Sequence, residues 1–165
     1  MRKLFLAALA FVSFSMANAQ SKTSGGGGKV TFGAGPVLSL PIGDFGLYSN
    51  LGYGAELQLT YEASTNFEGF AQVGYSSFSG KGAGSGSVGF LPILVGGRYV
   101  SNGLSFGAGI GYGSFSGSGS SSGGFAYSPQ VGYSFGKSQL IGSYNGISTS
   151  GSTSSFIGFK FFYGF

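Results

Sequence analysis

The sequence predicts an all-β protein, an eight-stranded antiparallel up-and-down transmembrane β-barrel. Apolar residues alternate with small or polar ones along most of the chain, which is the pattern of strands with one apolar face. Short and long connections alternate between these segments, as in a membrane barrel. The apolar face carries bulky Tyr, Phe and Leu, whereas the other face is mostly Gly and Ser, which suits a narrow lumen with large side chains outside.

The N-terminal residues 1–19 predict a secretory signal peptide. Two basic residues precede an apolar run at 4–12, and Ala17-Asn18-Ala19 supplies the small-residue pattern of a cleavage site. The apolar run is too short for a membrane-spanning helix, which needs about 20 residues. Residues 20–28 contain four consecutive glycines and predict a flexible leader, which leaves 29–165 for the barrel. The chain is therefore expected in the outer membrane, after export through the inner membrane.

The first half of the barrel contains four predicted strands. Segment 29–40 has an apolar face made of Val30, Phe32, Ala34, Leu38 and Leu40. Segment 52–62 is the clearest, because its apolar positions alternate strictly with Gly54, Glu56, Gln58, Thr60 and Glu62. Segments 67–79 and 89–100 alternate more weakly, and 89–100 is apolar on both faces around Leu91 to Val95. The register of this fourth strand is the least defined by the pattern.

Four more strands follow. Segment 104–113 alternates five apolar residues with Ser105 and four glycines. Segment 125–135 places Phe125, Tyr127, Val131, Tyr133 and Phe135 on one face, and 139–147 alternates weakly. Segment 155–165 alternates up to the terminal Phe165. Pro36, Pro92 and Pro129 fall inside predicted strands, where the missing backbone donor predicts bulged or frayed pairing.

The connections define the two ends of the barrel. Gaps 63–66, 101–103 and 136–138 have three or four residues, whereas 41–51, 80–88, 114–124 and 148–154 have seven to eleven. Short turns are typical of the periplasmic end and long loops of the extracellular end. Aromatic residues are then expected to form a girdle at the periplasmic interface, from Tyr61, Tyr99, Tyr133, Phe135, Tyr163 and Phe165.

Charge content separates a membrane barrel from a soluble one. Only 7% of the residues are charged, whereas a soluble barrel needs a charged surface. Two alternatives remain open. One is a soluble periplasmic ligand-binding barrel with its aromatic face inward, and the other is a Gly/aromatic-rich fibrous surface protein.

The composition also limits the chemistry. The chain has no His and no Cys, which excludes disulfides, thiolate or imidazole metal ligation and His-dependent nucleophilic catalysis. Gly136-Lys137-Ser138 lacks the first glycine of a phosphate-binding loop, because position 131 is Val. Removal of the signal peptide lowers the net charge from +4 to +2, which gives no reason to expect nucleic acid as a partner. We predict a non-enzymatic protein without catalytic residues, cofactor or metal.

The charged residues on the face of small residues form the one group that suggests a functional site. The predicted lumen network comprises Glu56, Glu62, Glu68, Arg98 and Lys160. Glu56 and Lys160 are expected to pair across the first strand, where Gly33 and Gly35 would leave room, because buried charges need partners. Such a network either plugs the barrel or lines a polar path for water and small solutes.

One long connection differs from the Gly/Ser-rich ones. Loop 41–51 contains Asp44, Phe45 and Tyr48, and is the candidate partner-binding loop. It could equally be a cap that folds back over the barrel mouth.

Several segments together resemble the PorT-like outer-membrane β-barrel domain proteins of Gram-negative bacteria. The resemblance covers 29–165, and its carriers are Leu40-Pro41-Ile42-Gly43-Asp44-Phe45, Gly52-Tyr53-Gly54-Ala55-Glu56-Leu57, Pro92-Ile93-Leu94-Val95-Gly96-Gly97-Arg98-Tyr99 and Gly107-Ala108-Gly109-Ile110-Gly111-Tyr112. It implies place and fold rather than a reaction. The C-terminus is similar to the signal read by the barrel-assembly machinery, with Phe165 and Tyr163 matching and Lys160 in place of the expected glycine.

The prediction is therefore a small outer-membrane barrel with a structural or passive role, such as membrane integrity, a narrow pore or a surface interaction module. Its expected partners are outer-membrane lipid and the barrel-assembly machinery. The pattern identifies no specific protein or ligand partner.

Overall fold

The computed structural model describes residues 28–82, 86–117, 119–149 and 151–165. The predicted signal peptide and all of the predicted leader except Gly28 lie outside these residues. The described chain forms one closed barrel in which every strand pairs with its neighbours in sequence, and β8 returns to pair with β1. The strands are β1 (Val30–Ile42), β2 (Ser49–Ser64), β3 (Phe67–Gly80), β4 (Ser87–Ser101), β5 (Leu104–Gly117), β6 (Ser120–Phe135), β7 (Ser138–Thr149) and β8 (Ser152–Gly164).

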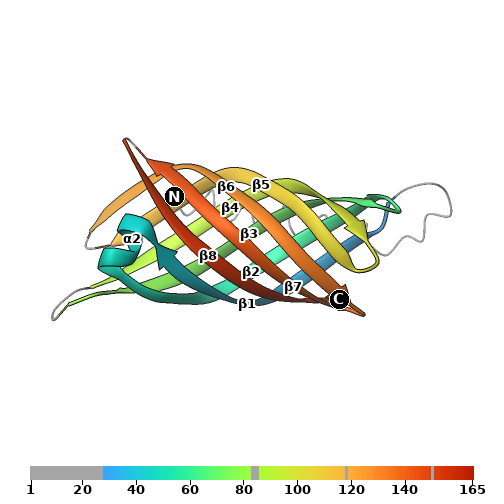
Figure 1. Cartoon of the computed structure of the whole chain (residues 1–165), viewed down its shortest axis with the longest axis horizontal. Helices are drawn as coiled ribbons and strands as arrows, with labels where there is room; N and C mark the ends of the chain where they lie inside the picture. Colours follow the sequence, from blue (N-terminus) through green and yellow to red (C-terminus); the bar gives the residue numbers. More distant parts are fainter. Residues whose placement is uncertain (1–27, 83–85, 118, 150) are drawn as a thin grey trace, which may run out of the picture.

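The predicted eight-stranded antiparallel barrel is confirmed. Each predicted strand is present, and most extend by a few residues at their long-loop ends. The strands are tilted against the long axis of the molecule (Figure 1). The first long loop contains a short helix, α2 (Gly43–Tyr48), which lies at the end opposite the C-terminus (Figure 1). No helix among the described residues is long and apolar enough to cross a membrane.

The apolar face of the strands points outward, which contradicts the soluble alternative with inward-facing aromatics. Leu57, Val73, Ile93, Val95 and Ile110 are all more than 40% exposed. Burial in the structure also defines the two faces of β4, which the sequence left open because both are apolar. Phe90 and Leu94 are buried in the lumen, whereas Ile93 and Val95 face outward.

Exposed aromatic residues border this outer band at both ends. At the short-turn end, Phe67 packs edge-on against Tyr99, and Tyr133 stacks on Phe135. A second group lies toward the long-loop end, and three strands carry one member of each group eight positions apart: Tyr53 and Tyr61, Phe67 and Tyr75, Phe125 and Tyr133. Eight residues span about 27 Å along a strand. At the usual tilt of about 35–45° this is about 19–22 Å along the barrel axis, slightly less than the apolar band of about 25 Å that membrane barrels present.

The prolines interrupt pairing without shifting it. The ladder between β1 and β8 has no paired residues between Ala34 and Val37, and the gap contains Pro36. The same two-residue gap occurs at Pro92 between β3 and β4 and at Pro129 between β6 and β7. The register is identical on both sides of each gap, so the prolines cause locally lost pairing, as the frayed alternative predicted, and not the bulges of the other alternative. A proline lacks one donor, and here only the ladder on one side of the strand is interrupted.

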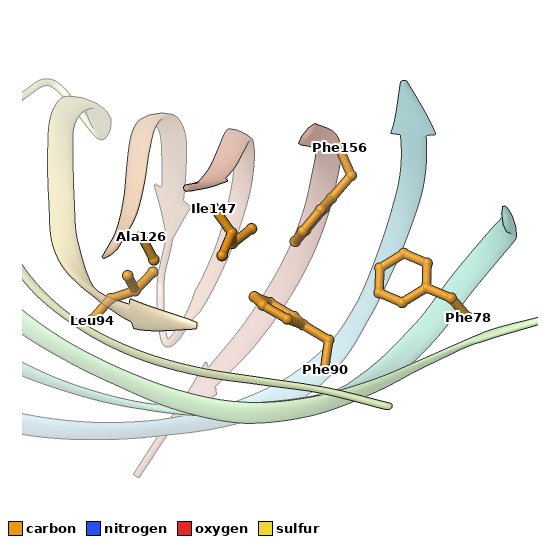
Figure 2. Packing of buried hydrophobic residues seen from close by; sticks show 6 residues of the cluster. All are labelled: Phe78, Phe90, Leu94, Ala126, Ile147 and Phe156. Carbon is orange, nitrogen blue, oxygen red and sulfur yellow. The ribbon is translucent and has the colours of Figure 1, made fainter. Parts of the chain in front are cut away.

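The long-loop half of the lumen holds an aromatic cluster, which the pattern did not predict. Figure 2 shows Phe78, Phe90 and Phe156 converging from β3, β4 and β8, next to Leu94, Ala126 and Ile147. Phe90 lies 5.2 Å from Phe156 and Phe78 lies 5.4 Å from it, between ring centroids, both edge-on. Edge-on aromatic pairs stabilise a core beyond their buried area. This end of the lumen is therefore a packed apolar core.

Candidate functional site: the polar layer of the lumen

Below the aromatic cluster, toward the short-turn end, the lumen is filled by charged and amide side chains. Lys160 on β8 is 3% exposed, and its Nζ donates to Glu56 Oε2 at 2.7 Å. Glu56 lies on β2, so the ion pair passes over the inner face of β1. The structure thus brings together the two residues that the sequence predicts to pair across the first strand.

The space for Glu56 comes from a different glycine than expected. A Cβ at Gly74, directly opposite Glu56 on β3, would lie 2.2 Å from Glu56 Cγ. At Gly35, by contrast, a Cβ would lie 1.6 Å from the backbone carbonyl oxygen of Phe161. Gly35 is therefore required by close strand approach alone. Gly74 makes room for the Glu56 side chain and also for the backbone oxygen of Ala55, which would lie 2.7 Å from the Cβ.

Arg98 on β4 forms the second ion pair of the lumen. Arg98 is 2% exposed, and its Nη1 donates to Glu68 Oε1 at 3.1 Å across the β3–β4 pairing. The guanidinium carbon lies 4.1 Å from the centre of the Phe70 ring, which adds a cation–π contact. Two cations and two carboxylates thus balance inside the lumen, as buried charges require.

Four glutamines join the two ion pairs, and sequence reasoning missed them as a group. Arg98 Nη2 donates to Gln58 Oε1 at 2.6 Å and to Gln130 Oε1 at 3.1 Å, and Arg98 Nη1 donates to Gln139 Oε1 at 3.1 Å. Gln72 Nε2 donates to Gln58 Oε1 at 2.8 Å, and Gln72 Oε1 accepts from Lys160 Nζ at 3.3 Å. We call Glu56, Glu68, Arg98, Lys160, Gln58, Gln72, Gln130 and Gln139 the polar layer.

Some hydrogen bonds of the polar layer join neighbouring strands, but others cross the barrel. Gln130 on β6 donates to Gln72 on β3 at 3.0 Å, and Gln58 on β2 donates to Gln139 on β7 at 2.9 Å. In each pair the two strands are three apart in a ring of eight, close to opposite sides. Side chains therefore obstruct the lumen at this level.

Glu62 does not join the polar layer as predicted. Its side chain is 49% exposed, and its Oε1 lies 3.8 Å from Lys29 Nζ at the short-turn rim. The parity of Glu62 is inward, but β2 has reached the end of the barrel at this height. Glu62 and Glu68 line a cavity of about 1000 Å³ that opens at this rim, with Gln58 and Gln139 also on its wall.

The long-loop mouth is covered by α2. Phe45 points into the aromatic cluster, with its ring 5.1 Å from Phe78 and 5.3 Å from Phe115 between centroids. Lys81 Nζ donates to the backbone oxygen of Gly46 and holds the helix from the β3–β4 connection. Of the predicted loop residues, Phe45 is thus part of a cap, whereas Asp44 and Tyr48 are exposed.

The remaining predicted residues lie at the opposite end. Tyr163 is 51% exposed and Phe165 is 67% exposed, on the outside of the rim. The backbone N–H of Phe165 donates to the carbonyl oxygen of Phe32, which ties the C-terminus to β1. Across the described ranges, no group of three or more acidic side chains is placed to hold a metal ion.

Comparison with solved structures places the fold among small outer-membrane barrels. Ail, the attachment invasion locus protein of Yersinia pestis, superposes with a TM-score of 0.60 at 16% identity, over 84% of this chain and 99% of that one. The N-terminal β-barrel domain of Pseudomonas aeruginosa OprF superposes with a TM-score of 0.58 at 13% identity, over 84% of this chain and 99% of that one. Neisserial surface protein A superposes with a TM-score of 0.51 at 14% identity, over 82% of this chain and 97% of that one. At such identities the likeness concerns the fold. Neither family models nor curated protein sequences match the chain.

Proposed function

We propose that this protein is a non-conducting outer-membrane β-barrel of a Gram-negative cell, with a structural role in the membrane and an exposed extracellular end. One observation carries the proposal: an apolar outer band surrounds a lumen that is obstructed at two levels. A closed barrel satisfies all backbone hydrogen bonds within lipid. The polar layer and the aromatic cluster favour a plug over the alternative of a polar path.

The finer assignments belong to the same proposal. The signal peptide at 1–19 would direct export, and Tyr163 and Phe165 would be read by the barrel-assembly machinery. The order of the motifs supports a PorT-like protein. The absence of His and Cys from the chain supports a role without catalysis.

Reconstitution followed by conductance measurement tests the proposal. Protein that floats with liposomes and shifts on a gel only after boiling is a membrane-inserted, folded barrel. In a planar bilayer we expect such protein to leave the membrane resistance unchanged. Steady single-channel currents would overturn the plug, and failure to float would overturn the membrane assignment.

A surface interaction role is favoured by one further observation. Leu47 is 65% exposed and Tyr48 is 73% exposed, on a helix that Phe45 anchors to the barrel. Because the chain has no Cys, a single Tyr48→Cys variant reports its own accessibility. We expect an impermeant maleimide to label Tyr48→Cys on intact cells but not Lys137→Cys in the β6–β7 turn. The opposite labelling would invert the proposed orientation.

A further inference from the structure

A groove of about 630 Å³ interrupts the outer face of the barrel over β5 to β8 and β1. Two rows of directly paired residues cross the strands here. The row nearer the short-turn end runs from Leu104 to Tyr133, Leu140 and Phe161. The second row runs from Val131 to Gly142, Phe159 and Leu38. Every position carries a bulky side chain except Gly142.

The groove exists because Gly142 has no side chain. A Cβ at Gly142 would meet only Val131, at 3.7 Å or more, so the space above this glycine is open. Gly146 also faces outward on β7, four residues after Gly142, but its surroundings differ. A Cβ there would lie 2.2 Å from the Tyr127 ring, which already fills the space. The missing side chain is thus compensated at Gly146 and not at Gly142.

We propose that this groove holds one acyl chain of a glycerophospholipid from the periplasmic leaflet. The inference rests on the proposed membrane location. The walls are apolar, and Leu38, Val131 and Phe159 are about half exposed. Within a bilayer the surrounding lipid is as apolar as these walls, so an acyl chain would be held by van der Waals packing in the groove. The groove begins at the short-turn end, where the phenol of Tyr133 would lie at the lipid interface.

A second copy of the chain fits the groove less well. Closed dimers usually form by two-fold contacts in which one patch meets its own copy. Two identical concave grooves facing each other would leave both unfilled. A flexible acyl chain, by contrast, can enter a groove that is open to the bilayer along its length.

Native mass spectrometry can count the retained lipid. The barrel is reconstituted in vesicles of palmitoyl-oleoyl phosphatidylethanolamine and phosphatidylglycerol and then extracted in mild detergent. We expect one phospholipid on the wild type and its loss in Gly142→Leu, which fills the groove. Ala71→Leu is the matched control. Ala71 faces outward on β3, four residues after the start of its strand, as Gly142 does on β7. It lies on the opposite side of the barrel from the groove. Ala71→Leu should retain the lipid.

A tryptophan reporter locates the lipid, since the chain contains no Trp. With brominated acyl chains, fluorescence of Phe159→Trp should stay quenched after extraction, whereas Val95→Trp on β4 should recover. Three results would overturn the inference. They are equal quenching of the two Trp reporters after extraction, a phospholipid still bound to Gly142→Leu, and a dimer found in place of the lipid-bound monomer. If neither reporter is quenched even in intact vesicles, the proposed membrane location itself fails.

Discussion

Lys160 Nζ lies 2.7 Å from Glu56 Oε2, and this ion pair links β8 to β2 over the inner face of β1. Both side chains are about 95% buried or more. Because β1 and β8 close the barrel, the pair lies beside the seam that joins the first and last strands. It therefore couples the closure of the barrel to the polar layer.

Lys160→Met is expected to destabilise the barrel by about 3–5 kcal/mol, because it leaves Glu56 buried without a cation. Combining it with Glu56→Gln should recover most of this loss, since the uncompensated charge is then gone. Urea unfolding in lipid vesicles, arranged as a double-mutant cycle, measures the coupling. Lys137→Met, at an exposed turn, is the matched control and should be neutral. Additive effects of the two lumen substitutions would contradict the coupling.

Gly74→Ala tests whether glycine is what gives Glu56 its space. The new methyl group would lie 2.2 Å from Glu56 Cγ and 2.7 Å from the backbone oxygen of Ala55, so the Glu56 side chain and the local backbone must shift. Overpacking of this kind costs about 1–3 kcal/mol. Gly142→Ala adds the same methyl group to open space and should leave the free energy of unfolding unchanged or raise it slightly. Equal effects of the two substitutions would show that Gly74 has no special role.

The barrel and the outward direction of its apolar face were predictable because strand periodicity is a local signal. Five of the eight strands alternate clearly with period two and three alternate more weakly, and inward parity placed Glu56, Arg98 and Lys160 in the lumen. The alternation also placed Glu62 on the inward face, but the local sequence does not show how far along the barrel axis Glu62 lies. Whether a residue lies in the lumen or at its rim depends on where the whole barrel ends.

The glutamine network and the aromatic cluster were missed for two different reasons. Gln58 and Gln130 lie on the inward face predicted by the alternation, but their hydrogen bonds to Gln139 and Gln72 join strands far apart in the ring. Inward parity shared by four glutamines was the available signal. Phe90 lies in a strand whose two faces are both apolar, so alternation could not assign it to the lumen. Phe78 is a single bulky residue among serines at the end of β3, where the alternation is weak.

Phe45→Ala is expected to release α2 from the barrel mouth. The helix has only six residues and no side-chain cap at its N-terminus, so it depends on the contacts of Phe45 with Phe78 and Phe115 and on the Lys81 hydrogen bond. Amide hydrogen exchange in 43–48 should accelerate, while exchange in the strands stays slow. Tyr48→Ala, which removes an exposed ring from the same helix, should not change the exchange. Unchanged protection in Phe45→Ala would show that the helix is held by other contacts.

Two obstructions in series predict a specific pattern of conductance. Gln58→Ala with Gln130→Ala removes amides that cross the polar layer but leaves the aromatic cluster intact. Phe45→Ala with Phe78→Ala opens the aromatic level but leaves the polar layer. Each pair of substitutions should therefore give no channel current in a planar bilayer, whereas all four together should give a measurable one. Boiling-dependent gel mobility confirms that each variant is folded before it is measured. A current from either pair alone would show that the remaining level does not seal the lumen, because ions would then pass around side chains that the structure places across the barrel axis.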